Sequence, residues 1–228
     1  MNINKHLILL FSVLFFLFAV SVSSGCFRKN ESDVKSVVRN ELDQLKNLDS
    51  ETTQKYIPYT ELFPDATENT DLTDEINETF SLFFRKFNYK ISDVIVGTAN
   101  HSATVSVKLT TIDSKVLARD FKAELLRTQI TESAQAQKGN IKDSSRSLEA
   151  HYLIPNHLLN TNDYDTAETD CNIQLVNTGN DKKEKWKIQR TNSLEDDLVG
   201  GLIADLADPD ILSPEDTLTV YLDTLQKL

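Results

Sequence analysis

The sequence predicts an α+β fold with N-terminal helices, four antiparallel strands and extra C-terminal helices. Apolar residues recur at helical spacing near both ends of the chain, over 32–48 and 213–228. Between them, two pairs of segments alternate apolar and polar residues with the period of a β-strand, over 89–110 and 167–189. The 228 residues are 39% hydrophobic and include 11 phenylalanines, which permits one substantial core.

Residues 32–48 are predicted to form an amphipathic helix with charged residues between its apolar positions. The apolar positions are Val34, Val37 or Val38, Leu42, Leu45 and Leu48. Asp49 or Ser50 then offers an N-cap for a short helix, which must end before Pro58. We expect a loop over 58–72.

A second long helix is predicted after Thr73, whose hydroxyl can cap it. Its apolar stripe is Ile76, Phe80, Phe83 or Phe84, and Phe87. Because aromatic rings bury large areas, this stripe is interpreted as the aromatic centre of the core and not as a ligand site.

Two strand pairs follow from the alternation. The first joins 89–96 to 103–110 through a turn, and the second joins 167–175 to 185–189 through turn-forming residues at 178–181. Each pair is expected to bury one face, with Trp186 and Ile188 on the same side.

Helices are also predicted between and after the strand pairs. Asp113 can cap a helix that runs towards Ile130, and residues 131–146 lack periodicity, which indicates a flexible surface excursion. A helical turn over 147–153 is expected to end at Pro155.

The last part of the chain contains two further helix starts. Ser193 begins one of them, with Glu195, Asp196 and Asp197 at the positive end of the helix dipole, which favours capping over metal binding. Ser213 and Pro214 begin the other, which carries apolar residues at Leu218, Tyr221 or Leu222, Leu225 and Leu228.

The N-terminal segment predicts export. Lys5 precedes an apolar run from Leu7 to Val22, and these 16 residues fall short of the roughly 20 that a membrane-spanning helix needs. Small residues at 23, 24 and 25 stand directly before Cys26. This end of the run resembles the lipobox of bacterial lipoproteins.

The lipobox resemblance implies that residues 1–25 are a signal peptide and that the thiol of Cys26 receives a diacylglycerol. Cleavage before Cys26 then makes this residue the new amino terminus. A short tether, 26–31, would then join the lipid to a single domain over 32–228 at the extracytoplasmic face of the cell membrane. Two or more acyl chains anchor a protein stably. An ordinary secretory signal cleaved nearby and an uncleaved anchor helix remain alternatives.

The charge of the chain excludes some partners. The formal net charge is −11, and loss of residues 1–25 removes Lys5 and no acid. Such a chain lacks the clustered Lys and Arg that bind nucleic acid or anionic lipid, so we expect no nucleic-acid partner and no electrostatic adhesion to the membrane.

No pattern identifies catalytic, cofactor-binding or metal-ligating residues. Cys171 is in phase with the apolar residues Ile173 and Leu175, which predicts a buried side chain and not a nucleophile. Asp93 is a candidate general base because Ile91 and Ile95 flank it in phase, but this strand carries apolar residues on both faces, which favours a side chain that faces water.

Two other groups of residues are candidate metal ligands by type but not by spacing. His151 and His157 are six residues apart, a spacing that matches no standard zinc motif. Asp163, Asp165 and Asp170 lack the glycine and terminal glutamate of a calcium loop. The two histidines are expected to lie on the surface.

The order of predicted elements, together with four short motifs, resembles that of small lipoproteins of Gram-positive bacteria with a cystatin-like fold of the nuclear transport factor 2 type. The motifs are Phe87–Ile91, Ala103–Val107, Lys185–Ile188 and Leu198–Leu202. The resemblance implies a curved sheet that wraps a long helix to form a cone, whose open end is a ligand pocket, a catalytic chamber or a dimer face. The same fold serves unrelated functions.

Three functions are therefore weighed. The leading hypothesis is a lipid-anchored, non-catalytic module that binds a small apolar ligand or a protein, and it predicts an exposed apolar patch. The second is an accessory subunit of a cell-envelope complex. The third is an enzyme that uses the cone as a chamber, which predicts a buried carboxylate or histidine with a perturbed pKa.

Overall fold

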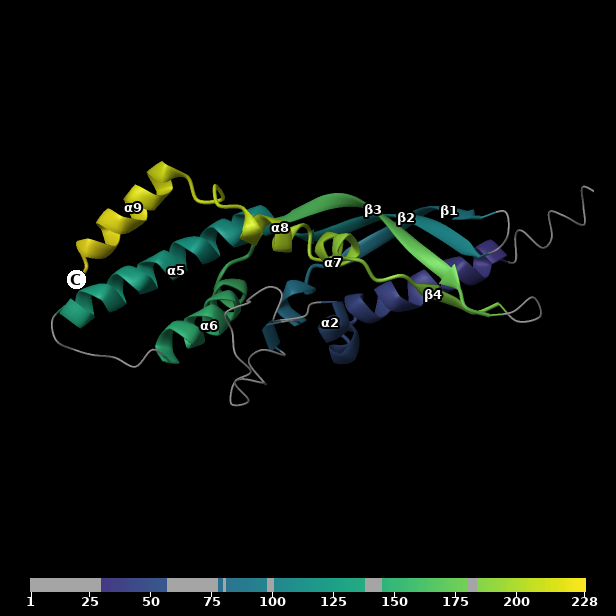
Figure 1. The fold of residues 1–228 in the computed structure, drawn as a ribbon, viewed down its shortest axis with the longest axis horizontal. Helices are drawn as coiled ribbons and strands as arrows, with labels where there is room; N and C mark the ends of the chain where they lie inside the picture. Colours follow the sequence, from purple (N-terminus) through teal and green to yellow (C-terminus); the bar gives the residue numbers. More distant parts are fainter. Residues whose placement is uncertain (1–29, 57–77, 80, 98–100, 138–144, 180–183) are drawn as a thin grey trace, which may run out of the picture. The chain divides into compact units, whose positions relative to one another are not determined.

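The fold is a mixed α+β arrangement with a four-stranded antiparallel sheet, in the order β1-β2-β3-β4. This computed structural model describes residues 30–56, 78–79, 81–97, 101–137, 145–179 and 184–228 (Figure 1). The α+β class and the four antiparallel strands predicted from the sequence are confirmed.

The sheet is built from β1 (Asn88–Val96), β2 (Ser102–Ile112), β3 (Thr166–Asn177) and β4 (Trp186–Ile188). Alternate residues are buried along the two central strands, as their hydrophobic pattern predicts. The buried residues of this alternation are Ala103, Val105, Val107, Leu109 and Thr111 of β2 and Cys171, Ile173 and Leu175 of β3; Ile112, the last residue of β2, is buried as well.

The described residues divide into two compact units. One unit contains the described residues within 30–40, 91–106 and 172–189, and the other contains those within 41–90, 107–171 and 190–228. The expected single domain over 32–228 is not tested by this division and stays a prediction.

In the first unit, the end of β3 pairs with β4 in antiparallel register. Leu175 is opposite Ile188, and Asn177 is opposite Trp186. The side chain of Asn177 accepts hydrogen bonds from the amides of Gly179 and Lys185 at 2.9 and 3.0 Å. These bonds fix both ends of the connection between the two strands.

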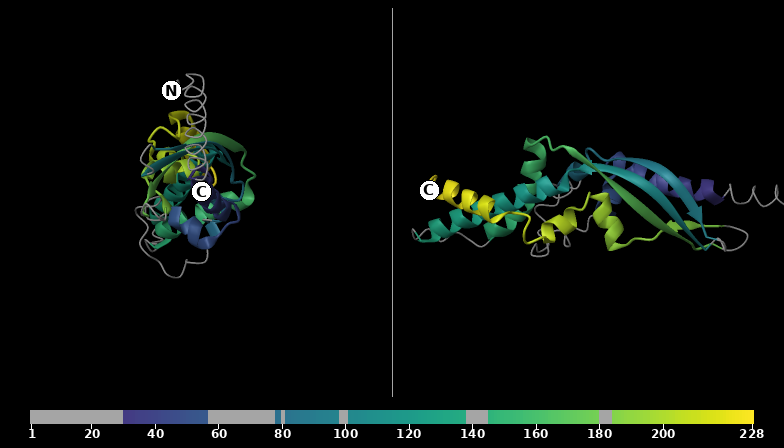
Figure 2. Two further views of the ribbon diagram at one scale, coloured as in Figure 1. Left: turned by 90° about the vertical axis from the view of Figure 1, so that its right-hand side faces the viewer. Right: turned by 90° about the horizontal axis from the view of Figure 1, so that it is seen from above.

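In the second unit, the long helix α5 (Ser114–Gln137) packs against α6 (Ser145–Thr161), α8 (Leu202–Ala207) and α9 (Pro214–Leu225) (Figures 1 and 2). The same unit contains α2 (Ser50–Tyr56) and α7 (Asn192–Leu198). Its core includes Phe84 and Phe87, whose rings meet edge to face with centroids 5.6 Å apart.

A helix over 30–46 buries four of its predicted apolar positions, Val34, Val38, Leu42 and Leu45. The prediction that Leu48 continues this stripe is wrong, because Leu48 follows the end of the helix with φ 58° and is 38% exposed. Asp49 then caps α2, where its Oδ1 accepts a 2.9 Å bond from the amide of Thr52. The helix predicted after Thr73 lies partly outside the described residues. Its described part is helical at 78–79 and 81–83.

The helix predicted to end near Ile130 is longer than expected. Asp113 caps α5 as predicted, with Oδ1 3.3 Å from the amide of Val116, but α5 continues to Gln137. Residues 131–137 are therefore helical and do not belong to a flexible excursion, while 138–144 lie outside the described residues. The sequence did not predict this extension, because helical periodicity is recognised from apolar residues and the added segment 131–137 is largely polar.

The prediction that a helix ends at Pro155 is also wrong, since α6 contains Pro155. Proline removes one helical hydrogen bond and costs about 3 kcal/mol in a helix interior. Leu158 and Leu159 are buried on the following turn, and the carbonyl of Leu159 accepts a 2.9 Å bond from Arg85. These contacts outweigh the local cost of the proline.

Candidate functional site

Cys26, the predicted lipid attachment site, lies outside the described residues, as does the whole of the predicted signal peptide. Among the described residues, no helix is long and apolar enough to cross a bilayer. Lipid attachment at Cys26 therefore stays a prediction.

Asp93 is exposed on β1 and does not face an apolar chamber. Its Oδ1 accepts a 2.9 Å hydrogen bond from the amide of Val94, the next residue. A general base needs a desolvated carboxylate beside its substrate. Asp93 is not buried, and no polar side chain among the described residues is shown in contact with its carboxylate, so we propose no catalytic role for it.

The residues considered as metal ligands are not brought together. Asp163 is paired with Lys86, whose ammonium lowers the pKa of that carboxyl, and the exposed Asp170 lies on β3. The backbone carbonyl of Asp165 accepts a bond from the amide of Asp113, and His157 is exposed on α6, the helix that also contains His151. Across the described part of the chain, no three His, Cys, Asp or Glu residues are grouped to hold a metal ion.

Cys171 is buried on β3, as predicted. Burial raises its pKa to about 12, and the nearby Asp197 carboxylate adds to the effect. Since the thiolate is the nucleophilic form, the thiol is inert at neutral pH. Desolvation in turn raises the pKa of Asp197, against the hydrogen bond from Cys171.

The acidic triplet at 195–197 serves three separate structural purposes. Glu195 is buried and pairs with Arg190, while Asp197 faces Cys171. Asp196 accepts hydrogen bonds from the amides of Ile203 and Ala204 at 2.8 and 3.3 Å, which satisfies the first turn of α8. The prediction placed all three acids at the start of α7, but only Glu195 lies in its first turn, and Asp196 instead accepts bonds at the start of α8. The N-cap of α7 is Thr191, not Ser193.

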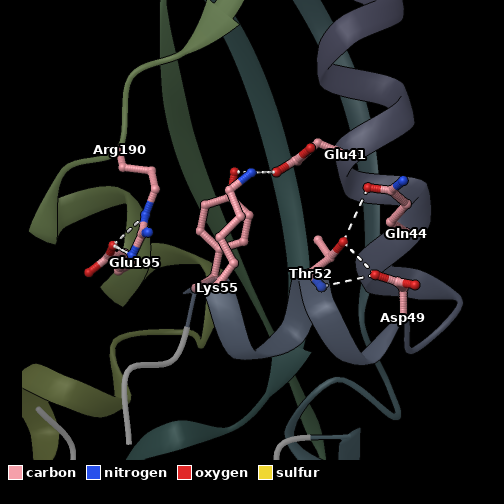
Figure 3. A network of polar contacts seen from close by, with 8 residues as sticks. Glu41, Gln44, Asp49, Thr52, Lys55, Arg190 and Glu195 are labelled. Carbon is pink, nitrogen blue, oxygen red and sulfur yellow. Dashed lines mark hydrogen bonds and ion pairs between the residues drawn. The ribbon is translucent and has the colours of Figure 1, made fainter. Parts of the chain in front are cut away.

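Tyr56 of α2 contacts Glu41 of the helix over 30–46 and also Arg190, which pairs with Glu195 of α7; Figure 3 labels these three partners. The hydroxyl of Tyr56 donates a 2.9 Å bond to Glu41, which also pairs with Lys55. Arg190 lies over the Tyr56 ring, 5.7 Å from its centroid, and donates from Nε and Nη2 to Glu195 at 3.0 and 2.5 Å. Burial raises the pKa of Tyr56 above its ordinary value, and the Glu41 charge adds to this.

This network is best explained as structural. Both carboxylates already have a basic partner, and Tyr56 is only 1% exposed. Charges that are paired and hydrogen-bonded fix the geometry of the elements that carry them. Sequence reasoning missed this network because Tyr56 and Arg190 are far apart in the sequence and meet only through the fold.

The most unusual surface lies on α9. Four large apolar side chains, which we call the α9 stripe, are between 43% and 58% exposed: Leu218, Tyr221, Leu222 and Leu225. Helical geometry places them within about 100° of the helix circumference. On the other side of α9, the contact with the rest of its unit is narrow, because Val220 and Thr224 are the buried residues of this helix.

The sequence predicted the spacing of this stripe correctly, but not which face of α9 is buried. Leu228 continues the same spacing and is also exposed, at 43%. Large exposed apolar patches on a folded protein mark interaction surfaces. The α9 stripe is therefore the candidate functional site.

Comparison with known proteins adds no family to this description. No protein-family model, no curated protein and no solved structure matches the chain.

Proposed function

We propose that this protein is a lipid-anchored interaction module at the extracytoplasmic face of the cell membrane, attached through a diacylglycerol on Cys26. The apolar run that ends in small residues before Cys26 supports the anchor. We also propose that the helices and the sheet form the cystatin-like cone, which the order of the elements supports.

The α9 stripe is the observation that carries the interaction role. Exposing four large apolar side chains to water is unfavourable by about 25 cal/mol for each Å². Burial of these side chains against a partner would recover this free energy. The stripe lies on a helix surface and not in a chamber, so it favours a protein partner over a small apolar ligand.

The alternative role, an accessory subunit of a cell-envelope complex, would use the same α9 stripe. It would make the partner contact permanent. An enzymatic role has less support, because Asp93 is exposed and burial raises the pKa of the Cys171 thiol, so neither of these two residues is suited to catalysis.

Lipid attachment is tested by expressing the full chain in a bacterium with lipoprotein processing and measuring the intact mass of the product. The expected product begins at Cys26 and carries the mass of a diacylglycerol. In the Cys26→Ala variant, the chain should stay unprocessed or be released from the membrane.

Thiol counting gives an independent readout. The denatured product should contain one free thiol, Cys171, because the sulfur of Cys26 would be a thioether. Two free thiols per chain, or an intact first methionine, would show that the anchor is wrong.

A further inference from the structure

We infer that Asp93, together with a bulge in β1, closes the edge of the sheet against the addition of a β-strand from a second copy of this chain. This inference concerns a surface other than the α9 stripe and does not depend on the proposed function.

β1 is the strand at which such an addition would take place. In the strand order β1-β2-β3-β4, β1 lies at one edge and has nine residues, whereas β4 at the other edge has three. Within the described part of the chain, no strand pairs with the outer side of β1. The outer side of an edge strand presents amides and carbonyls that can pair with another chain, and a long edge presents more of them.

A bulge interrupts the middle of β1. Burial alternates from Asn88 to Ser92 and resumes at Asp93 in the opposite phase, so Ser92 and Asp93 are exposed one after the other. The hydroxyl of Ser92 donates a 3.0 Å bond to the carbonyl of Ser106 in β2. One extra residue in a strand produces this change of phase and twists the strand locally. A regular incoming strand therefore cannot keep its hydrogen bonds in step along the whole edge.

Asp93 also occupies an amide on the outer side of this edge. The amide of Gly97 donates a 2.8 Å bond to the carbonyl of Ser102, so it points towards β2. Because successive amides of a strand point to opposite sides, the amides of Val96 and Val94 point away from β2. Oδ1 of Asp93 accepts a 2.9 Å bond from the amide of Val94. One outward amide is thus already bonded, and the side chain that bonds it places a negative charge on the edge.

Two copies would meet this charge twice. In a symmetric dimer each copy contributes the same edge, so two Asp93 carboxylates would enter the shared ladder. Each carboxylate would have to release the Val94 amide and lose water before the strands could bond. Both costs oppose pairing, and both disappear when residue 93 has no carboxylate.

The test replaces this carboxylate without adding a large apolar side chain. Asp93→Thr removes the charge and the carboxylate that bonds Val94, and threonine favours strands. Sedimentation velocity of the full chain in a mild detergent should give an association constant at least about tenfold larger than that of the parent. Asp170→Thr is the matched control, because Asp170 is an exposed carboxylate on β3, which is not an edge strand. It should associate like the parent.

Hydrogen–deuterium exchange shows where the copies meet. In Asp93→Thr, exchange over residues 88–96 should slow as the protein concentration rises, because the amides of Val94 and Val96 become paired. The parent should show no such dependence on concentration. Asp93→Ser is a second replacement that should change both measurements in the same direction, with an unchanged circular dichroism spectrum.

Three results would overturn the inference. They are association of Asp93→Thr no stronger than that of the parent, equally strong association of Asp170→Thr, and concentration-dependent protection that lies outside β1. Association through the α9 stripe would raise the values for the parent and the variants alike, so the comparison between them still isolates the β1 edge.

Discussion

The hydroxyl of Thr111 occupies the space that a side chain at Gly200 would need. A Cβ atom at residue 200 would lie 2.3 Å from Oγ1 of Thr111 and 3.2 Å from the carbonyl oxygen of Ile112. Gly200 also has φ +73°, a left-handed conformation that favours glycine. Close packing and backbone conformation therefore both require glycine at the connection between α7 and α8.

Replacing Gly200 should destabilise the fold more than replacing its neighbour. Gly200→Ala combines a left-handed backbone with a steric clash, so we expect a loss of more than about 2 kcal/mol in the free energy of unfolding. Gly201→Ala is the control, because Gly201 has φ +90° but the nearest atom to its added Cβ is 3.8 Å away. Urea denaturation of both variants measures the difference. Equal losses would mean that the contact with Thr111 is irrelevant.

Removing the Thr111 hydroxyl should stabilise the protein. Its Oγ1 is buried and, within the described residues, has no hydrogen-bond partner. A buried unsatisfied polar group costs about 1–3 kcal/mol, and valine keeps the shape of threonine. Thr111→Val is therefore expected to raise the free energy of unfolding by about 1 kcal/mol.

Thr224→Val is the matched control for this change. Thr224 is also buried, but its hydroxyl donates a 2.6 Å bond to the carbonyl of Val220. Its replacement should give no gain in stability. If Thr111→Val proved as destabilising as a lost hydrogen bond, the Thr111 hydroxyl would have a partner in solution.

Arg190 should matter because Glu195 is buried beside it. Arg190→Met leaves the Glu195 carboxylate without its basic partner, and we expect a loss of about 2 kcal/mol, since the half-exposed Arg190 side chain admits some water. The double variant Arg190→Met, Glu195→Leu should recover much of this loss.

The pair of Lys108 and Glu168 is the surface control, with side chains 47% and 62% exposed. Lys108→Met should change the free energy of unfolding by less than about 1 kcal/mol. Similar losses for Lys108→Met and Arg190→Met in thermal or urea unfolding would show that burial of Glu195 adds nothing.

Local pattern predicted the sheet better than the helices. Alternation along β2 identified the buried face because one side of a strand faces the core and the other does not. Caps at Asp113 and Ser213 were also correct, since a cap depends on residues three positions away.

Features that depend on long-range packing were not predictable in this way. The continuation of α6 through Pro155 depends on burial of Leu158 and Leu159, and the exposure of the α9 stripe depends on which face of α9 meets α5. An apolar stripe has the same sequence signature whether it faces a core or a partner. The candidate site therefore became visible only with the fold.

The buried thiol of Cys171 should make the protein sensitive to alkaline pH. The pKa of Cys171 is raised to about 12 from an ordinary value of 9.0, so above pH 9 the unfolded chain releases a proton that the folded chain retains. Stability that is complete below pH 9 is then lost as the pH rises towards 12, by at most about 1.4 kcal/mol per pH unit for one group.

The Cys171→Ala variant separates this effect from other alkaline titrations. Tyr164, whose pKa burial raises to about 12, contributes only above its ordinary value of 10.0. Between pH 9 and 10, the free energy of unfolding should therefore fall more steeply for the parent than for Cys171→Ala, although the variant starts from a lower value because of the cavity it creates. Above pH 10, Tyr164→Phe should show a shallower fall than the parent. Parallel curves for the parent and Cys171→Ala from pH 9 to 10 would mean that the thiol titrates alike in the folded and unfolded chain, and hence that it is open to water.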